Sequence, residues 1–98
     1  MSSSYENVTR AMNILDGKGS IQERLASAYR TELQFVGPEG LDEKSINTLE
    51  MINDELTKIE AEGDKDTIDM STDMLSDGDA QDLVNQIRDI YQYLSKHH

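Results

Sequence analysis

The side chains of this chain that could do chemistry are mostly carboxylates, and they gather in one segment. From Glu60 to Asp82 there are nine acidic side chains and one basic one, which accounts for −8 of the total formal charge of −11. Four of these acids recur at spacings of three and four residues, so they would share one face of a helix: Asp66, Asp69, Asp73 and Asp77. A face of this kind either keeps the chain soluble or binds a basic partner.

Two methionines lie beside this predicted acidic face. Met70 and Met74 fall between it and a thin apolar line in the same segment. Flexible thioethers suit adaptable binding surfaces, and acids beside methionine are what a groove for a basic amphipathic helix requires. The sequence therefore predicts a small interaction protein that binds a basic protein or amphipathic peptide, as an adaptor, a chaperone-like protein or an inhibitor. The predicted partner-binding residues are Asp66, Asp69, Met70, Asp73, Met74 and Asp77.

Two alternative functions use the same observations. In the first, the carboxylates imitate phosphates and block a DNA- or RNA-binding protein, which predicts strong salt dependence and little effect from Met70→Ala or Met74→Ala. In the second, the chain is a purely structural homodimer that buries an apolar helix face. A low apolar content of 36% leaves room for such a dimer. Light scattering at several concentrations distinguishes the homodimer.

The residue types argue against an enzyme and against a metal or cofactor site. There is no cysteine, and the only histidines are His97 and His98, at the end of the chain, where no rigid shell can orient them. The acidic segment does not match a calcium loop, and the run from Asp16 to Ser20 lacks the spacing of a phosphate-binding loop. We therefore expect no catalytic residue, no metal and no cofactor. An enzyme would need a closed pocket around Glu32, which we expect to lie in water, the alternative being a half-buried carboxylate held by a tyrosine or arginine.

Charge and composition also limit the partners and the location. An acidic chain does not attract nucleic acid or an anionic membrane surface. No apolar run approaches the ~20 residues of a membrane span, and the first residues do not resemble a secretory signal. A secreted chain this short usually relies on disulfides, so we expect a cytoplasmic, bacterial protein.

The elements that would position these residues are helices. Apolar residues recur at helical spacing, proline occurs once, and glycines fall between the periodic segments. We predict an all-α, up-and-down bundle of four or five helices in one domain, residues 1–98, with residues 1–3 and 96–98 as frayed tails. The predicted helices are residues 4–15, 20–36, 41–62, 64–77 and 79–95.

Side chains that could cap the helices support this division. Ser3 and Ser20 each stand three residues before a glutamate, the spacing of a capping box, while Asp42 and Asp79 are candidate caps further along. Gly63 is a candidate C′ residue, and Asp77-Gly78-Asp79 is predicted to end the helix at residues 64–77. The stretch Leu41–Glu62 has the longest apolar stripe, so we expect it to organise the fold by packing on residues 79–95.

Overall fold

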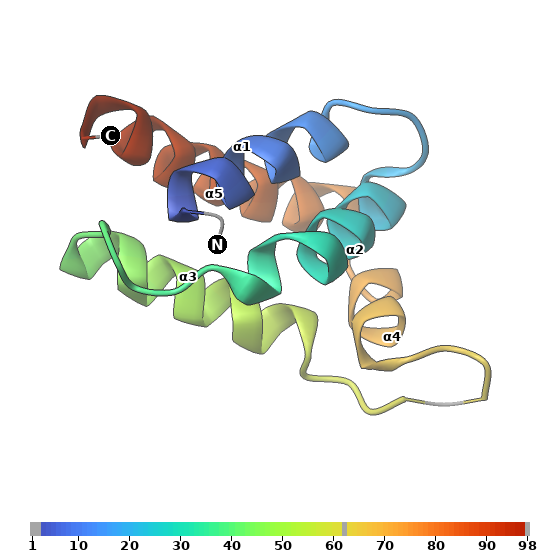
Figure 1. Ribbon diagram of the computed structural model, residues 1–98. Coiled ribbons are helices and arrows are strands. Elements are labelled where there is room, and N and C mark those ends of the chain that lie inside the picture. Colours follow the sequence, from blue (N-terminus) through green and yellow to red (C-terminus); the bar gives the residue numbers. More distant parts are fainter. Residues whose placement is uncertain (1–2, 62, 98) are drawn as a thin grey trace.

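The protein is an all-α helical bundle. The computed structural model describes residues 3–61 and 63–97. Within them the α-helices are α1 (Ser4–Leu15), α2 (Ile21–Thr31), α3 (Glu43–Leu56), α4 (Thr67–Asp73) and α5 (Asp77–His97), with a 3-10 turn at Leu33–Phe35. Figure 1 shows α1, α2, α3 and α5 running back and forth beside one another, with the short α4 below α2 at one end. The predicted fold class is confirmed.

Side-chain caps fix the starts of four helices. The side chains of Ser3, Ser20 and Asp42 accept backbone N–H bonds from the third residue after each, at 3.2, 3.1 and 3.0 Å. These three predicted caps are confirmed. Asp66 caps α4 in the same way, accepting from the Asp69 N–H at 2.9 Å. A cap of this kind satisfies one of the N–H groups that a helix leaves without an internal partner.

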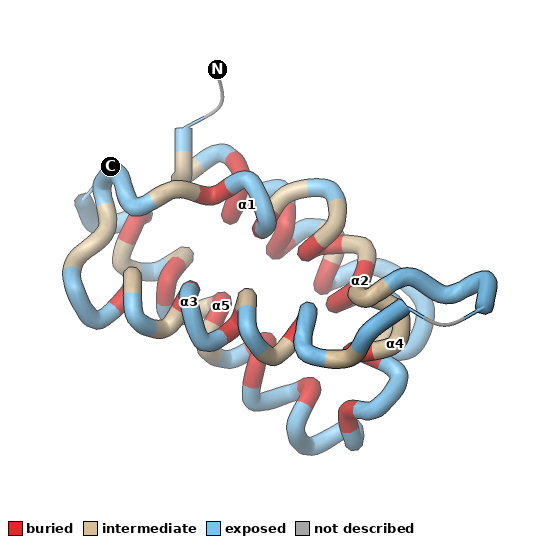
Figure 2. Tube along the Cα trace, turned by 90° about the horizontal axis from the view of Figure 1, so that it is seen from below, coloured by how far each residue is buried: buried red, intermediate tan, exposed pale blue. Residues whose placement is uncertain are grey.

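The core lies between α5 and the helices around it. α5 is the longest helix and is in contact with α1, α2 and α3. Its buried side chains Leu83, Ile87, Ile90 and Leu94 belong to one apolar cluster with residues of α1, α2 and α3. Figure 2 shows the buried positions on the sides of the helices that face one another. The expected pairing of α3 with α5 is present, but α5 rather than α3 joins the bundle together.

The central helix is shorter than predicted. α3 ends at Leu56, not at Glu62, which lies outside the described residues. The Thr57 hydroxyl donates back to the Asn53 carbonyl at 2.6 Å, and Thr57 itself leaves helical geometry with φ −131°. Such a bond competes with the helix ladder and is typical of a helix end. Gly63 does adopt a left-handed φ of +61°, but in the connection to α4 rather than at the end of a helix.

The second predicted helix also ends early. α2 stops at Thr31, and Leu33–Phe35 continues as one 3-10 turn instead of reaching Val36 in α-helical form. Leu33 and Val36 are still buried, at 2% and 8% exposure. The tighter turn therefore keeps the apolar residues on the core while the helical path changes.

The boundary between the last two helices was placed wrongly. α4 covers only Thr67–Asp73, and α5 begins at Asp77. Its cap is Ser76, whose hydroxyl accepts from the Asp79 N–H at 3.1 Å, so Asp79 is not the cap. The Asp77-Gly78-Asp79 sequence lies in the first turn of α5 and does not break the chain, because carboxylates are favoured near the positive end of a helix dipole.

The far end of α5 extends beyond the predicted limit. We expected a frayed tail from residue 96, yet α5 continues through His97. His98 and residues 1–2 of the predicted tails lie outside the described residues.

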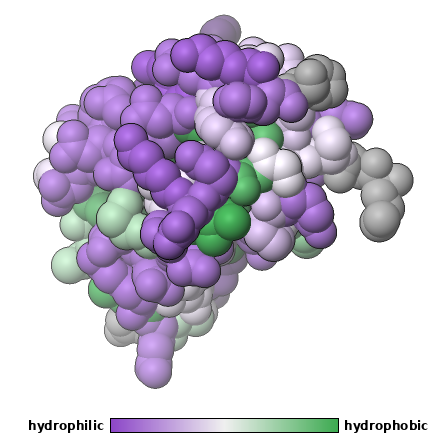
Figure 3. Space-filling view, turned by 90° about the vertical axis from the view of Figure 1, so that its left-hand side faces the viewer, coloured by the Kyte–Doolittle hydropathy of each residue, from purple (hydrophilic) through white to green (hydrophobic). Residues whose placement is uncertain are grey.

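Figure 3 shows the end of the bundle that includes the C-terminal turn of α5, where the surface is mostly hydrophilic with small hydrophobic areas. No described helix combines the length and the apolar character needed to cross a membrane.

Candidate functional site: a methionine-lined groove between two helices

The carboxylates of the predicted acidic face form ion pairs and hydrogen bonds with other side chains of the protein. One terminal nitrogen of Arg30, on α2, lies 3.0 and 2.9 Å from the two carboxylate oxygens of Asp66 and 3.0 Å from Asp69 Oδ1. Helix spacing within one segment does not predict these contacts, because Arg30 belongs to a different helix. Arg30 ties α4 to α2.

The other two predicted aspartates also have partners. Lys65 forms an ion pair with Asp73, and Asp77 Oδ1 accepts from Gln22 Nε2 at 2.9 Å. The same amide nitrogen of Gln22 donates to the Leu75 carbonyl at 3.0 Å, so Gln22 holds the turn between α4 and α5. Asp66, Asp69 and Asp77 thus attach α4 and its flanks to α2, whereas Asp73 holds the segment before α4.

The pKa values of the charged groups follow from these contacts. The hydrogen bonds to Asp69 and Asp66 raise the pKa of Arg30, and the hydrogen bond to Asp73 raises that of Lys65. The pKa of Asp66 lies below its ordinary value because its carboxylate accepts the Asp69 backbone N–H and then the Arg30 guanidinium. Each shift favours the charged form. The shifts of Arg30 and Asp66 therefore favour the attached position of α4, and that of Lys65 favours its ion pair with Asp73.

The two predicted methionines are separated by the structure. Met70 is half-buried in α4, whereas Met74, which follows the last residue of α4, is 69% exposed. Only Met74 of the predicted pair therefore offers a large apolar surface to a partner.

Met74 lines a groove between α3 and the start of α5. The groove has a volume of about 300 Å³ and is also lined by Met51, whose side chain is 42% exposed on α3. Leu75 and Leu83 contribute apolar lining, while Gln86 comes from the next turns of α5. Met51 lies off the apolar stripe of its helix, and no local pattern connects it with Met74, because the two are far apart in the chain.

Carboxylates of two helices line this groove as well. Glu55 comes from α3, and Asp79 and Asp82 come from α5. Lys58 also lines the groove and forms an ion pair with Glu55 at 2.8 Å, whereas no basic side chain of residues 3–61 and 63–97 forms an ion pair with Asp79 or Asp82. The sequence predicts apolar side chains beside free carboxylates at residues 66–77. In the structure this combination lies instead in the groove, where the free carboxylates are those of Asp79 and Asp82.

A buried hydroxyl holds the connection that leads to Met74. Ser71 is fully buried in α4, and its Oγ accepts the backbone N–H of Ile59 at 3.0 Å. Ile59 belongs to the segment that leaves α3. This bond and the Arg30 contacts fix α4 against both α2 and α3, and so they set where Met74 lies relative to Met51.

Glu32 does not lie in open water as expected. Its side chain is 14% exposed, and its Oε1 accepts from Arg10 Nε at 2.9 Å and from Asn7 Nδ2 at 3.1 Å. The alternative of a half-buried carboxylate held by an arginine is therefore the one observed. Arg10 and Asn7 both belong to α1, so the carboxylate links α1 to the end of α2.

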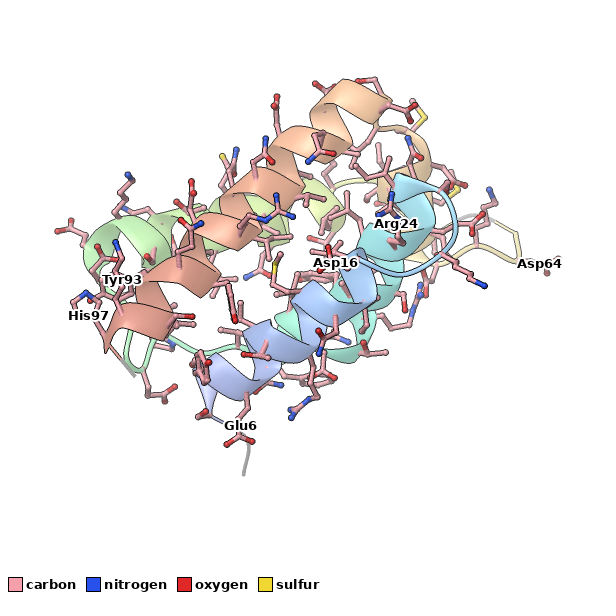
Figure 4. All side chains as sticks on the ribbon, turned by 90° about the horizontal axis from the view of Figure 1, so that it is seen from above. Glu6, Asp16, Arg24, Asp64, Tyr93 and His97 are labelled. Atoms are coloured by element: carbon pink, nitrogen blue, oxygen red, sulfur yellow. The ribbon has the colours of Figure 1, made fainter. Side chains whose placement is uncertain are left out.

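The C-terminal histidine lies against an aromatic ring. The ring centroids of Tyr93 and His97 are 4.3 Å apart, at the end of α5 (Figure 4). Within the described residues, no group of three or more histidine, aspartate or glutamate side chains is placed to hold a metal ion.

Comparison with known proteins found no matching family model, no matching curated protein and no matching solved structure.

Proposed function

We propose that this chain is a small, non-enzymatic interaction protein that binds a basic protein or amphipathic peptide through the groove lined by Met51 and Met74. The observation that supports it most is the position of these two methionines. They are two of the three large hydrophobic side chains that are exposed in the described part of the chain, and they reach one groove from α3 and from the turn after α4.

The charge of the groove supports a cationic partner over a second copy of the chain. Asp79 and Asp82 are exposed beside it, and the whole chain carries −11. Two such copies would repel each other, while a basic partner would be steered toward the groove. Apolar contact with the methionines would then set how long the partner stays bound. An adaptor, a chaperone-like protein or an inhibitor would each use a surface of this kind, and the lack of cysteine favours the cytosol.

The test uses a synthetic peptide with leucine and lysine at helical spacing, and a matched peptide with glutamate in place of lysine. Calorimetry should detect binding of the lysine peptide only. Met51→Ala and Met74→Ala should each weaken it about fivefold or more, as expected for residues at the centre of an interface. Phe35→Ala is the matched control, because Phe35 is 67% exposed but does not line the groove.

The same titrations separate the alternative functions. Binding that falls steeply with salt but is unchanged by both methionine variants would contradict the proposal and favour imitation of nucleic acid. Concentration-dependent dimerisation without peptide binding would contradict it in favour of a homodimer. In a pull-down from the native host, loss of a specific partner on Met74→Ala would agree with the proposal, and an unchanged partner list would contradict it.

A further inference from the structure

One side chain that lines the groove has a polar atom without a hydrogen-bond partner in the described part of the chain. Gln86, half-buried on α5, lines the groove and also a second hollow beside Ser45 and Thr48 of α3. Its amide oxygen Oε1 is buried from solvent, and no group among residues 3–61 and 63–97 donates a hydrogen bond to it. Most buried side-chain polar atoms are hydrogen-bonded, so this oxygen is unusual and would gain from any donor that reaches it.

The size of the groove limits what that donor can be. A volume of about 300 Å³ is at the lower end of the range of ligand pockets, roughly 300–1,000 Å³. It suits one long side chain better than a ring system or a whole helix. Only one end of a partner residue therefore enters, and the rest of the partner lies outside on the methionines.

The lining selects the chemistry of that side chain. Thioethers at Met51 and Met74 suit an apolar stem, and the exposed carboxylates of Asp79 and Asp82 suit a positive charge. Lysine and arginine combine an apolar stem with a head that only donates hydrogen bonds. The last torsion of a glutamine side chain is soft, so Oε1 can turn from its buried position to the surface of the groove.

We infer that the groove is a receptor for one long cationic side chain of the partner, with its stem between Met51 and Met74 and its head donating to Gln86 Oε1. This inference rests on the proposed function and adds the residue that recognises the donor. Gln86 then distinguishes a lysine or arginine from an apolar residue of the same length.

The experiment is a double-mutant cycle between Gln86 and the peptide. Lysines of the synthetic peptide are replaced one at a time by norleucine, which keeps the length and removes the head. Gln86→Leu should weaken the lysine peptide by about three- to tenfold, and should have no effect on the peptide whose anchoring lysine is norleucine. Gln86→Glu should strengthen the lysine peptide. An arginine peptide should respond to both variants in the same direction.

Two controls make the cycle decisive. Gln92→Leu, at an exposed position on the same helix and away from the groove, should leave binding unchanged. Gln86→Leu should fold normally, because exchanging a glutamine whose oxygen has no partner for leucine removes an unsatisfied acceptor. If Gln86→Leu and Gln92→Leu bind the lysine peptide alike, or every norleucine peptide binds as tightly as its parent, the inference is wrong.

The outcomes also separate this inference from the proposed function. If Met51→Ala and Met74→Ala weaken binding while Gln86→Leu does not, the groove binds the partner but Gln86 does not recognise a cationic side chain of it. If none of the three variants has an effect, the groove is not the binding site and both ideas fail.

Discussion

Replacing Ser71 by alanine should loosen the connection between α3 and α4. The Ser71 hydroxyl is fully buried and accepts the N–H of Ile59 at 3.0 Å. The alanine variant removes that acceptor and almost no volume, so the main cost is a partly buried N–H left without a partner. We expect a loss of about 1–3 kcal/mol in the free energy of unfolding. Each kcal/mol corresponds to about 4–8 °C in Tm for a domain of this size.

Thr72→Val is the matched control for this prediction. Thr72 is as buried as Ser71 and neighbours it on α4, but its hydroxyl donates to the Ile68 and Asp69 carbonyls of its own helix, at 3.0 and 3.1 Å. Valine has nearly the same shape and leaves no donor without an acceptor. The control should therefore lose less stability than Ser71→Ala.

Urea unfolding and amide hydrogen exchange measure the two effects. Ser71→Ala should lower the unfolding midpoint, and the Ile59 amide should exchange faster than in Thr72→Val. Equal destabilisation of both variants, or unchanged exchange at Ile59 in Ser71→Ala, would refute the role given to this hydrogen bond.

Three further predictions concern pH, the core and the turns. The Asp69 N–H and Arg30 lower the pKa of Asp66. Its contribution to stability is therefore complete above its unfolded-state pKa of about 4 and is lost as the pH falls below that value. Acid unfolding followed by circular dichroism should show that the stability of Asp66→Asn depends less on pH in this range than that of the parent protein. Ile87→Ala should cost about 2–5 kcal/mol in chemical unfolding, because Ile87 is 1% exposed in α5, and a loss under 1 kcal/mol would contradict its place in the core. Gly40→Ala should lower the free energy of unfolding by about 1–2 kcal/mol, because Gly40 has a φ of +80°. Gly78→Ala, in the first turn of α5, should leave stability unchanged or raise it. A larger loss for Gly78→Ala than for Gly40→Ala would contradict this prediction.

Local sequence was sufficient where a helix end depends on neighbours in the chain. Ser3, Ser20 and Asp42 cap the helices they were predicted to cap, because each bond joins residues three apart. The end of α3 was harder to place. The apolar spacing continues to Ile59, but the N–H of Ile59 bonds to Ser71 of another helix, which no periodicity shows.

The candidate site could be predicted only in part, for the same reason. The chemistry of acids beside methionine was anticipated, and Met74 is in the groove. The predicted aspartates of residues 66–73 instead form ion pairs with Arg30 of α2 and with Lys65 of the segment before α4. Met51 entered the site through tertiary packing alone.

The most direct test of the groove is an NMR titration of the protein labelled at its methionine methyl groups and its backbone amide nitrogens, with the leucine–lysine peptide as the probe. The methyl signals of Met51 and Met74 should shift strongly, and that of Met12, which is 8% exposed in the core, should stay in place. Shifts confined to the backbone amides of residues 66–73, with the Met51 and Met74 methyl signals unchanged, would contradict the account.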